Sequence, residues 1–163
     1  MMTDGGVAAA DERWDDAIEA YTKVQEMDAD DIEGAKSLRK KVLKQKQAAA
    51  RRTVEEHKQE GEAYLQVNDW EHAAEKFTAA LEEDAACGGK QAKGLNRLVA
   101  KTKTGPAWHA AQLLEAVEEW PKAVAKYEEA LELDPSDEGG RGLKKSLKAA
   151  KKAAAKDEVY PWE

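Results

Sequence analysis

The feature that most constrains the fold is a short segment that occurs three times in the chain. Each copy holds a tryptophan, an alanine three positions later and an aromatic residue four positions after that alanine. The copies read DERWDDAIEAYTKVQEMDA at residues 11–29, VNDWEHAAEKFTAALEEDA at residues 67–85 and VEEWPKAVAKYEEALELDP at residues 117–135. The repeated positions are Trp14, Ala17 and Tyr21; Trp70, Ala73 and Phe77; and Trp120, Ala123 and Tyr127. Spacings of three and four place these side chains on one face of an α-helix.

Such a face suits close packing between helices. A small residue between two large rings lets a neighbouring helix approach, while the rings fill the space on either side. Replacing a buried ring of this kind with alanine typically costs about 3–5 kcal/mol. The three copies therefore predict three pairs of packed helices.

The composition favours helices along the whole chain. Alanine, lysine, glutamate and leucine recur throughout the 163 residues, and only four prolines interrupt the sequence. A chain of this length buries one continuous core. We therefore expect a single all-α domain over residues 1–163, with repeat 1 at about 1–53, repeat 2 at about 54–103 and repeat 3 at about 104–163.

The repeated positions resemble those of the tetratricopeptide repeat family, whose unit of about 34 residues is a helix-turn-helix. Gly61 and Tyr64 precede Trp70 where the family has a small residue and an aromatic on its first helix, and Pro135 matches the family's terminal proline. The resemblance implies an α-solenoid of helical hairpins. The first copy is the poorest match, because residues 3–10, with two adjacent glycines, would have to form its first helix.

The spacing between the copies departs from that family, since successive tryptophans lie 56 and 50 residues apart. Three further stretches resemble one another: AKSLRKKV from residue 35, AKGLNRLV from residue 92 and GRGLKKSL from residue 140. We interpret each as an extra basic helix between repeats, which gives a unit of three helices. The first either runs into repeat 2 as one helix of about 33 residues or breaks between residues 47 and 52. The second is expected to end at Thr104-Gly105-Pro106.

The charge alternates along the chain in step with these elements. The total is -7, from 33 acidic and 26 basic residues, and this sign argues against nucleic acid as the main ligand. The segments carry -8 (1–31), +7 (32–53), -8 (54–87), +5 (88–103), -6 (104–137) and +3 (138–163). Two explanations stay open. Acidic hairpins and basic helices attract each other within the fold, or the basic helices dock on an acidic partner, such as an acidic tail or a second copy of the chain.

The sequence lacks the groups of residues that catalysis or cofactor binding requires. His57, His72 and His109 are far apart, and Cys87 is the only cysteine. We therefore expect no enzymatic activity, no metal and no cofactor. A single cysteine suits a reducing compartment such as the cytoplasm. The absence of an apolar run of about 20 residues predicts a soluble chain without membrane insertion.

The resemblance also implies where a partner binds. In tetratricopeptide proteins the first helix of each hairpin lines a concave groove for peptides. The corresponding positions here are Lys58, Glu62, Gln66, Trp108 and Gln112. Trp108 is either an anchor for an apolar partner or part of the packing within its hairpin.

One variant of that groove, in chaperone adaptors, holds C-terminal carboxylates with a clamp of Lys, Asn, Lys and Arg. Lys58 stands at the first clamp position, but Glu62 stands where the clamp needs asparagine. Gly105 and His109 occupy the places of the later lysine and arginine. Because a carboxylate at position 62 repels a carboxylate ligand, the acidic tails of chaperones are disfavoured as partners.

Together these patterns predict a protein-protein interaction module, adaptor or co-chaperone-like, that binds a protein or peptide, with an acidic one as the candidate. The alternative is a structural subunit or spacer of a large assembly without independent binding activity. A weaker resemblance links residues 131–156 to the end of the repeat array in J-domain co-chaperones, although the chain has no His-Pro-Asp tripeptide.

Overall fold

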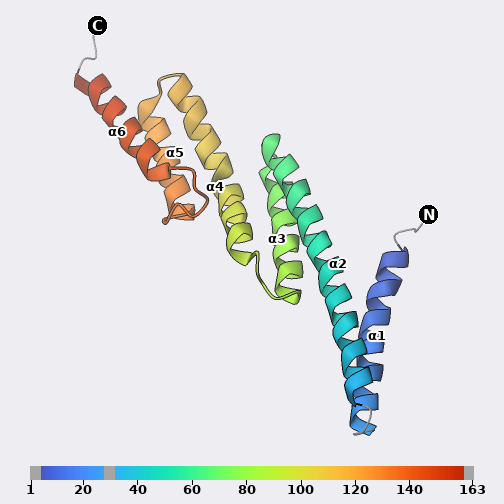
Figure 1. Ribbon diagram of the computed structural model, residues 1–163. Coiled ribbons are helices and arrows are strands. Elements are labelled where there is room, and N and C mark those ends of the chain that lie inside the picture. Colours follow the sequence, from blue (N-terminus) through green and yellow to red (C-terminus); the bar gives the residue numbers. More distant parts are fainter. Residues whose placement is uncertain (1–4, 28–31, 160–163) are drawn as a thin grey trace. The chain divides into compact units, whose positions relative to one another are not determined.

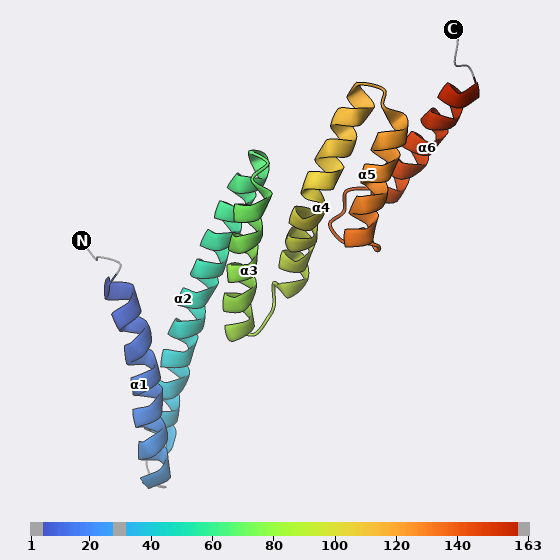
Figure 2. The ribbon, with the colours of Figure 1, turned by 180° about the vertical axis from the view of Figure 1, so that it is seen from behind.

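The computed structural model describes residues 5–27 and 32–159 and contains six helices in those ranges, with no strand among them (Figures 1 and 2). The expectation of an all-α helical repeat fold is confirmed. The chain divides into two compact units, Met1–Thr53 and Val54–Glu163. The long helix α2 (Ile32–Gln66) contributes residues to both of them.

The first unit holds α1 (Gly5–Met27) and the leading part of α2. The two helices are joined by an ion pair of 2.5 Å between Asp15 and Lys46. The hairpin expected within the first copy does not form, because α1 is one continuous helix that includes Trp14. Residues 3 and 4 of its expected first helix lie outside the described residues.

A missing large side chain explains why the first copy differs. Tyr64 and Leu114 lie six residues before the tryptophans of the second and third copies, whereas Ala8 has that place in the first. Without a large side chain to pack across a turn, a break near residue 12 gains nothing, so α1 continues. Trp14, Ala17 and Tyr21 are accordingly only half-buried, and the described residues of this unit include no fully buried side chain.

The second unit contains two antiparallel hairpins and a last helix. The trailing part of α2 pairs with α3 (Trp70–Ala86), and α4 (Ala92–Ala116) pairs with α5 (Trp120–Leu133). Helix α6 (Leu143–Val159) packs on α5, next to which it lies in both views (Figures 1 and 2).

Each hairpin turns at the same place of its repeat. Asn68 and Glu118, two residues before the tryptophans, both adopt the left-handed conformation, with φ of 58° and 59°. Asp69 then caps α3, since its side chain accepts a hydrogen bond from the backbone N–H of His72.

The packing faces predicted for the second and third copies are present. Ala73, Phe77, Ala123 and Tyr127 are buried. The Phe77 ring lies over Gly61, where an added Cβ would come within 2.7 Å of the ring. Half-buried positions are Tyr64, Trp70 and Trp120, while Pro135 is exposed after the end of α5. Small residues at these seams therefore let the rings approach the neighbouring helix.

The prediction that a helix ends at Thr104-Gly105-Pro106 is wrong, because α4 runs through Pro106 without a break. The proline removes the backbone donor for the Thr102 carbonyl. The two carbonyls before it in the same turn accept hydrogen bonds from side chains. Thr104 Oγ1 donates to the Ala100 carbonyl, and the Arg141 guanidinium donates to the Lys101 carbonyl. Gly105 is buried beneath the Trp70 ring, which explains why a glycine stands there.

The predicted unit of three helices is therefore wrong for the first two basic stretches, whereas the alternative of one long helix from the first stretch into repeat 2 is confirmed. Each is fused with the first helix of the following hairpin. The stretch from residue 35 lies in α2, which has 35 residues and shows no break at 47–52, and the stretch from residue 92 lies in α4. The stretch from residue 140 does lead to a separate helix, α6, but its first three residues belong to the preceding loop.

Candidate protein-binding groove

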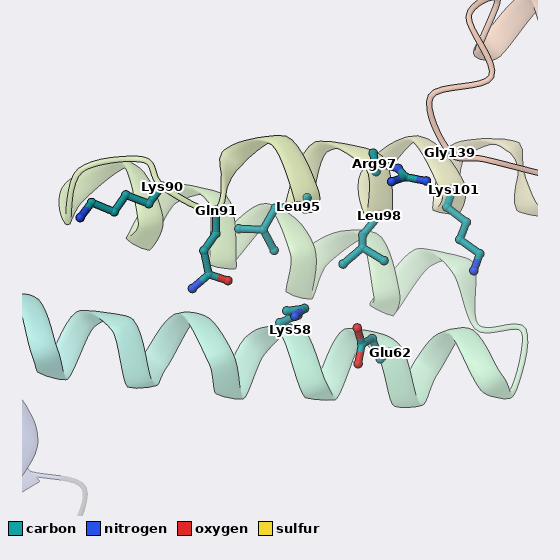
Figure 3. Close-up of a pocket in the computed structure, with 10 residues that line it drawn as sticks. Lys58, Glu62, Lys90, Gln91, Leu95, Arg97, Leu98, Lys101 and Gly139 are labelled. Carbon is teal, nitrogen blue, oxygen red and sulfur yellow. The ribbon is translucent and has the colours of Figure 1, made fainter.

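A groove lies between the trailing half of α2 and the leading half of α4, within the second unit (Figure 3). Its volume is about 540 Å³. Lys58 and Glu62 point into it from α2, and Leu95, Leu98 and Lys101 face them from α4. The remaining lining residues are Lys90, Gln91, Gly94, Arg97 and Gly139.

Helix periodicity places these side chains. Lys58 and Glu62 are four residues apart on α2, as are Arg97 and Lys101 on α4, so each pair shares one face of its helix. The floor is apolar and fixed. Leu95 is 1% exposed and forms a core cluster with Val54 and Ala80, and Leu98 packs against that cluster.

The groove is cationic in a chain whose total charge is negative. Four basic side chains line it against one carboxylate, Glu62; they are Lys58, Lys90, Arg97 and Lys101. Among the residues that the structure describes, none of the four forms an ion pair within 4.0 Å. Arg97 is steadied by a hydrogen bond to the Glu138 carbonyl. Their positive charge is therefore directed to solvent in the groove, where it attracts anions.

An aromatic section continues the groove toward the end of α2. Its volume is about 440 Å³, and it shares Glu62, Leu98 and Lys101 with the cationic section. The additional lining residues are Leu65, Gln66, Asn68, Trp70, Trp108 and Arg141. The two indole rings and the two leucines give this section an apolar surface, which lies beside about as much polar surface.

Arg141 contacts both tryptophans of the aromatic section. Its guanidinium carbon lies 4.4 Å from the centre of the Trp108 ring and 5.2 Å from that of the Trp70 ring. Its Nη2 donates to the Lys101 carbonyl at 2.6 Å, and its Nε donates to Thr104 Oγ1 at 3.1 Å. Burial lowers the pKa of Arg141, an effect that nearby Asp137 partly opposes. One side chain thus connects the tryptophan of α3 with two turns of α4.

Residues 109–140 match the family model of the tetratricopeptide repeat. The chain contains a tetratricopeptide repeat. The match covers the end of α4, all of α5 and the loop toward α6. These segments belong to the third hairpin, which α4 and α5 form around the third copy of the repeated segment. No curated protein and no solved structure matches the chain.

Tetratricopeptide repeats typically serve protein-protein interaction and not catalysis. The match does not extend to J-domain co-chaperones, so that weaker resemblance stays a prediction. Among the described side chains, no group of three His, Cys, Asp or Glu is placed to hold a metal ion. No helix in residues 5–27 or 32–159 is both long and apolar enough to cross a membrane.

Most of the groove residues implied by the tetratricopeptide resemblance lie in the two sections described above. Lys58 and Glu62 line the cationic section, and Glu62, Gln66 and Trp108 line the aromatic one. Gln112 is exposed on α4 and lines neither section. Trp108 packs against the core of the third hairpin and also lines the aromatic section, while its role as an anchor for an apolar partner stays a prediction.

Sequence reasoning missed Arg141, along with Lys90, Arg97 and Lys101 as members of one groove. Arg141 belongs to the Gly-Arg-Gly sequence that was interpreted as the start of a basic helix. The flanking Gly140 and Gly142 have φ of 69° and 68°, a conformation that signals a loop and not a helix. That glycine pair was the available clue, but it does not identify the tryptophans that the arginine contacts.

Proposed function

We propose that the chain is a protein-interaction module, an adaptor or co-chaperone-like protein, that holds an acidic segment of a partner in the groove between α2 and α4. The observation that supports this is the set of four basic side chains around an apolar floor, without ion pairs among the described residues. A carboxylate entering the groove gains attraction from several cations, whereas a neutral peptide gains only contact with Leu95 and Leu98.

The clamp that holds C-terminal carboxylates in chaperone adaptors remains an unfavourable description of this groove. Gly105, at the place of a clamp lysine, lies buried against Trp70 and presents no side chain to a ligand. Glu62 stands within the cationic section, where it opposes a carboxylate. Internal acidic segments, which spread their charge along the groove, suit this arrangement better than a paired terminal carboxylate.

The proposal is tested by fluorescence anisotropy with a labelled peptide of eight alternating Asp and Glu residues. We expect Lys58→Glu to weaken binding about tenfold or more, because one attraction becomes a repulsion. Lys144→Glu, at an exposed position of α6 and outside the groove, changes the net charge equally and serves as the matched control. Equal losses in the two variants would show that only overall charge matters and would contradict the groove proposal.

The alternative function, a structural subunit of a large assembly, is favoured by one observation on the first unit. Its described residues include no buried side chain, and Leu38 and Leu43 are 45% and 37% exposed. A helix pair whose described side chains form no core gains stability from a partner. Hydrogen exchange on the purified chain separates the two functions. Strong protection of residues 36–53 in the dilute chain would contradict the subunit proposal.

A further inference from the structure

The cationic and aromatic sections form one continuous groove, so a segment bound in the first is led into the second. Glu62, Leu98 and Lys101 belong to the walls of both. Figure 3 shows α2 and α4 running in the same direction past each other, with Lys58 to Glu62 on one wall and Arg97 to Lys101 on the other. A peptide lying along these walls passes from the four cations to the two indole rings.

The distance between the sections follows from α2. Lys58 lines only the cationic section and Leu65 only the aromatic one, and the two are seven residues apart. At about 1.5 Å per residue, α2 places the aromatic section about 10 Å beyond Lys58. Three residues of a polyproline-II segment span about 9 Å and return to the same face of the segment.

The surface of the aromatic section suits a flat apolar side chain. Leu65 and Leu98 provide aliphatic contacts, and Trp108 provides a ring face on which another ring packs. A second carboxylate gains less here, because Glu62 offsets the charge of Lys101, both of which the two sections share, and the Arg141 guanidinium already donates to the Lys101 carbonyl and Thr104. Charge complementarity thus acts in one section and apolar contact in the other.

We infer that the partner segment is bipartite, with a cluster of acidic residues and an aromatic side chain about three residues away that enters the section between Leu65, Leu98 and Trp108. This inference rests on the proposed function of the groove and adds the chemistry and spacing of the ligand. The aromatic residue supplies the selectivity that the cations lack, since any acidic segment satisfies the cationic section.

Three synthetic peptides with amidated C-termini test the spacing: Asp-Glu-Asp-Glu-Pro-Pro-Trp, the same peptide ending in Ala, and Asp-Glu-Asp-Glu-Trp-Pro-Pro. We expect the first to bind about tenfold more tightly than the other two in isothermal titration calorimetry, because only its indole reaches the aromatic section. Equal affinity of the first two peptides would overturn the inference, and equal affinity of the first and third would overturn the spacing.

A variant of the protein tests where the tryptophan of the peptide binds. Leu65→Ala should reduce the tenfold advantage of the tryptophan peptide to about twofold and leave the affinity of the alanine peptide nearly unchanged. Val67→Ala, an exposed position just beyond the end of α2 that does not line the aromatic section, is the matched control. An advantage that persists in Leu65→Ala would overturn the assigned site. If the alanine peptide binds but tryptophan adds nothing, only this inference fails, whereas absence of binding by all three contradicts the proposed function as well.

Discussion

The role of Arg141 as the connection between two hairpins can be tested by removing its side chain. Arg141→Ala eliminates the contacts with the Trp70 and Trp108 rings and the hydrogen bonds to the Lys101 carbonyl and Thr104. The variant should unfold more readily, because α3, α4 and the loop before α6 lose their shared contact.

The size of the effect follows from the contacts. Hydrogen bonds to a charged group contribute about 1.5–3 kcal/mol, and each stacked ring adds about 0.5–1 kcal/mol. Desolvation of the guanidinium, which lowers the pKa of Arg141, offsets part of this sum. We expect a net loss of about 2 kcal/mol, which for a unit of this size lowers the melting midpoint by about 10 °C.

The assay is thermal unfolding followed by circular dichroism, with two further variants. Arg141→Lys keeps the charge but loses the planar fork, so it should behave nearly like Arg141→Ala. Arg97→Ala removes an exposed arginine with a single hydrogen bond to the Glu138 carbonyl, and its midpoint should fall by at most about 2 °C. Midpoints for Arg141→Ala and Arg97→Ala that agree within error would refute this account of Arg141.

Three further predictions concern packing and ionisation. Gly105→Ala should lower the free energy of unfolding by about 1–2 kcal/mol in denaturant titration, because the added methyl meets the Trp70 ring. Gly94→Ala lies in the same helix with open space around it, so it should raise the free energy of unfolding by up to about 1 kcal/mol. Phe77→Ala should lose about 3–5 kcal/mol and Tyr21→Ala clearly less, since only Phe77 is fully buried; equal losses would contradict the difference between the two copies. Burial, reinforced by the nearby Glu115 carboxylate, raises the pKa of Tyr127 to about 12, above the value of about 10 in an unfolded chain. The folded state therefore keeps a proton that the unfolded state loses, and the free energy of unfolding falls as pH rises from about 10 to 12; urea titrations at several pH values should show a smaller fall in Tyr127→Phe.

The sequence predicted the seams of the second and third copies because that information is local. Trp70, Ala73 and Phe77 mark one helical face by their spacing, and Gly61 marks where the facing helix comes close. The first copy shows the limit of this reasoning. Trp14, Ala17 and Tyr21 keep the spacing, but the small side chain of Ala8 cannot pack across a turn, and α1 continues as one helix. A periodic face predicts a helix, whereas burial depends on which helix lies against it.

The continuity of α4 and the composition of the groove could not be predicted because they depend on contacts between distant residues. Gly105 and Pro106 are local signals for a helix end, yet α4 continues through both, where Gly105 lies against the Trp70 ring and Arg141 donates to the Lys101 carbonyl. Likewise, Lys58 and Lys101 share a groove because α4 lies beside α2. Helix α4 joins the basic stretch from residue 92 to the first helix of the third hairpin. Neither arrangement has a signature within a short window of sequence.

One measurement tests the groove proposal most directly, because the proposal predicts that a substitution increases the affinity for the peptide. Glu62 is the single carboxylate among the lining residues of the cationic section, so Glu62→Gln should tighten the binding of the Asp-Glu peptide about three- to tenfold in anisotropy at low salt. Misfolding cannot produce such a gain, and Glu82→Gln on the surface of α3 provides a control with the same change of charge. Unchanged or weaker binding by Glu62→Gln, or an equal gain in Glu82→Gln, would contradict the account.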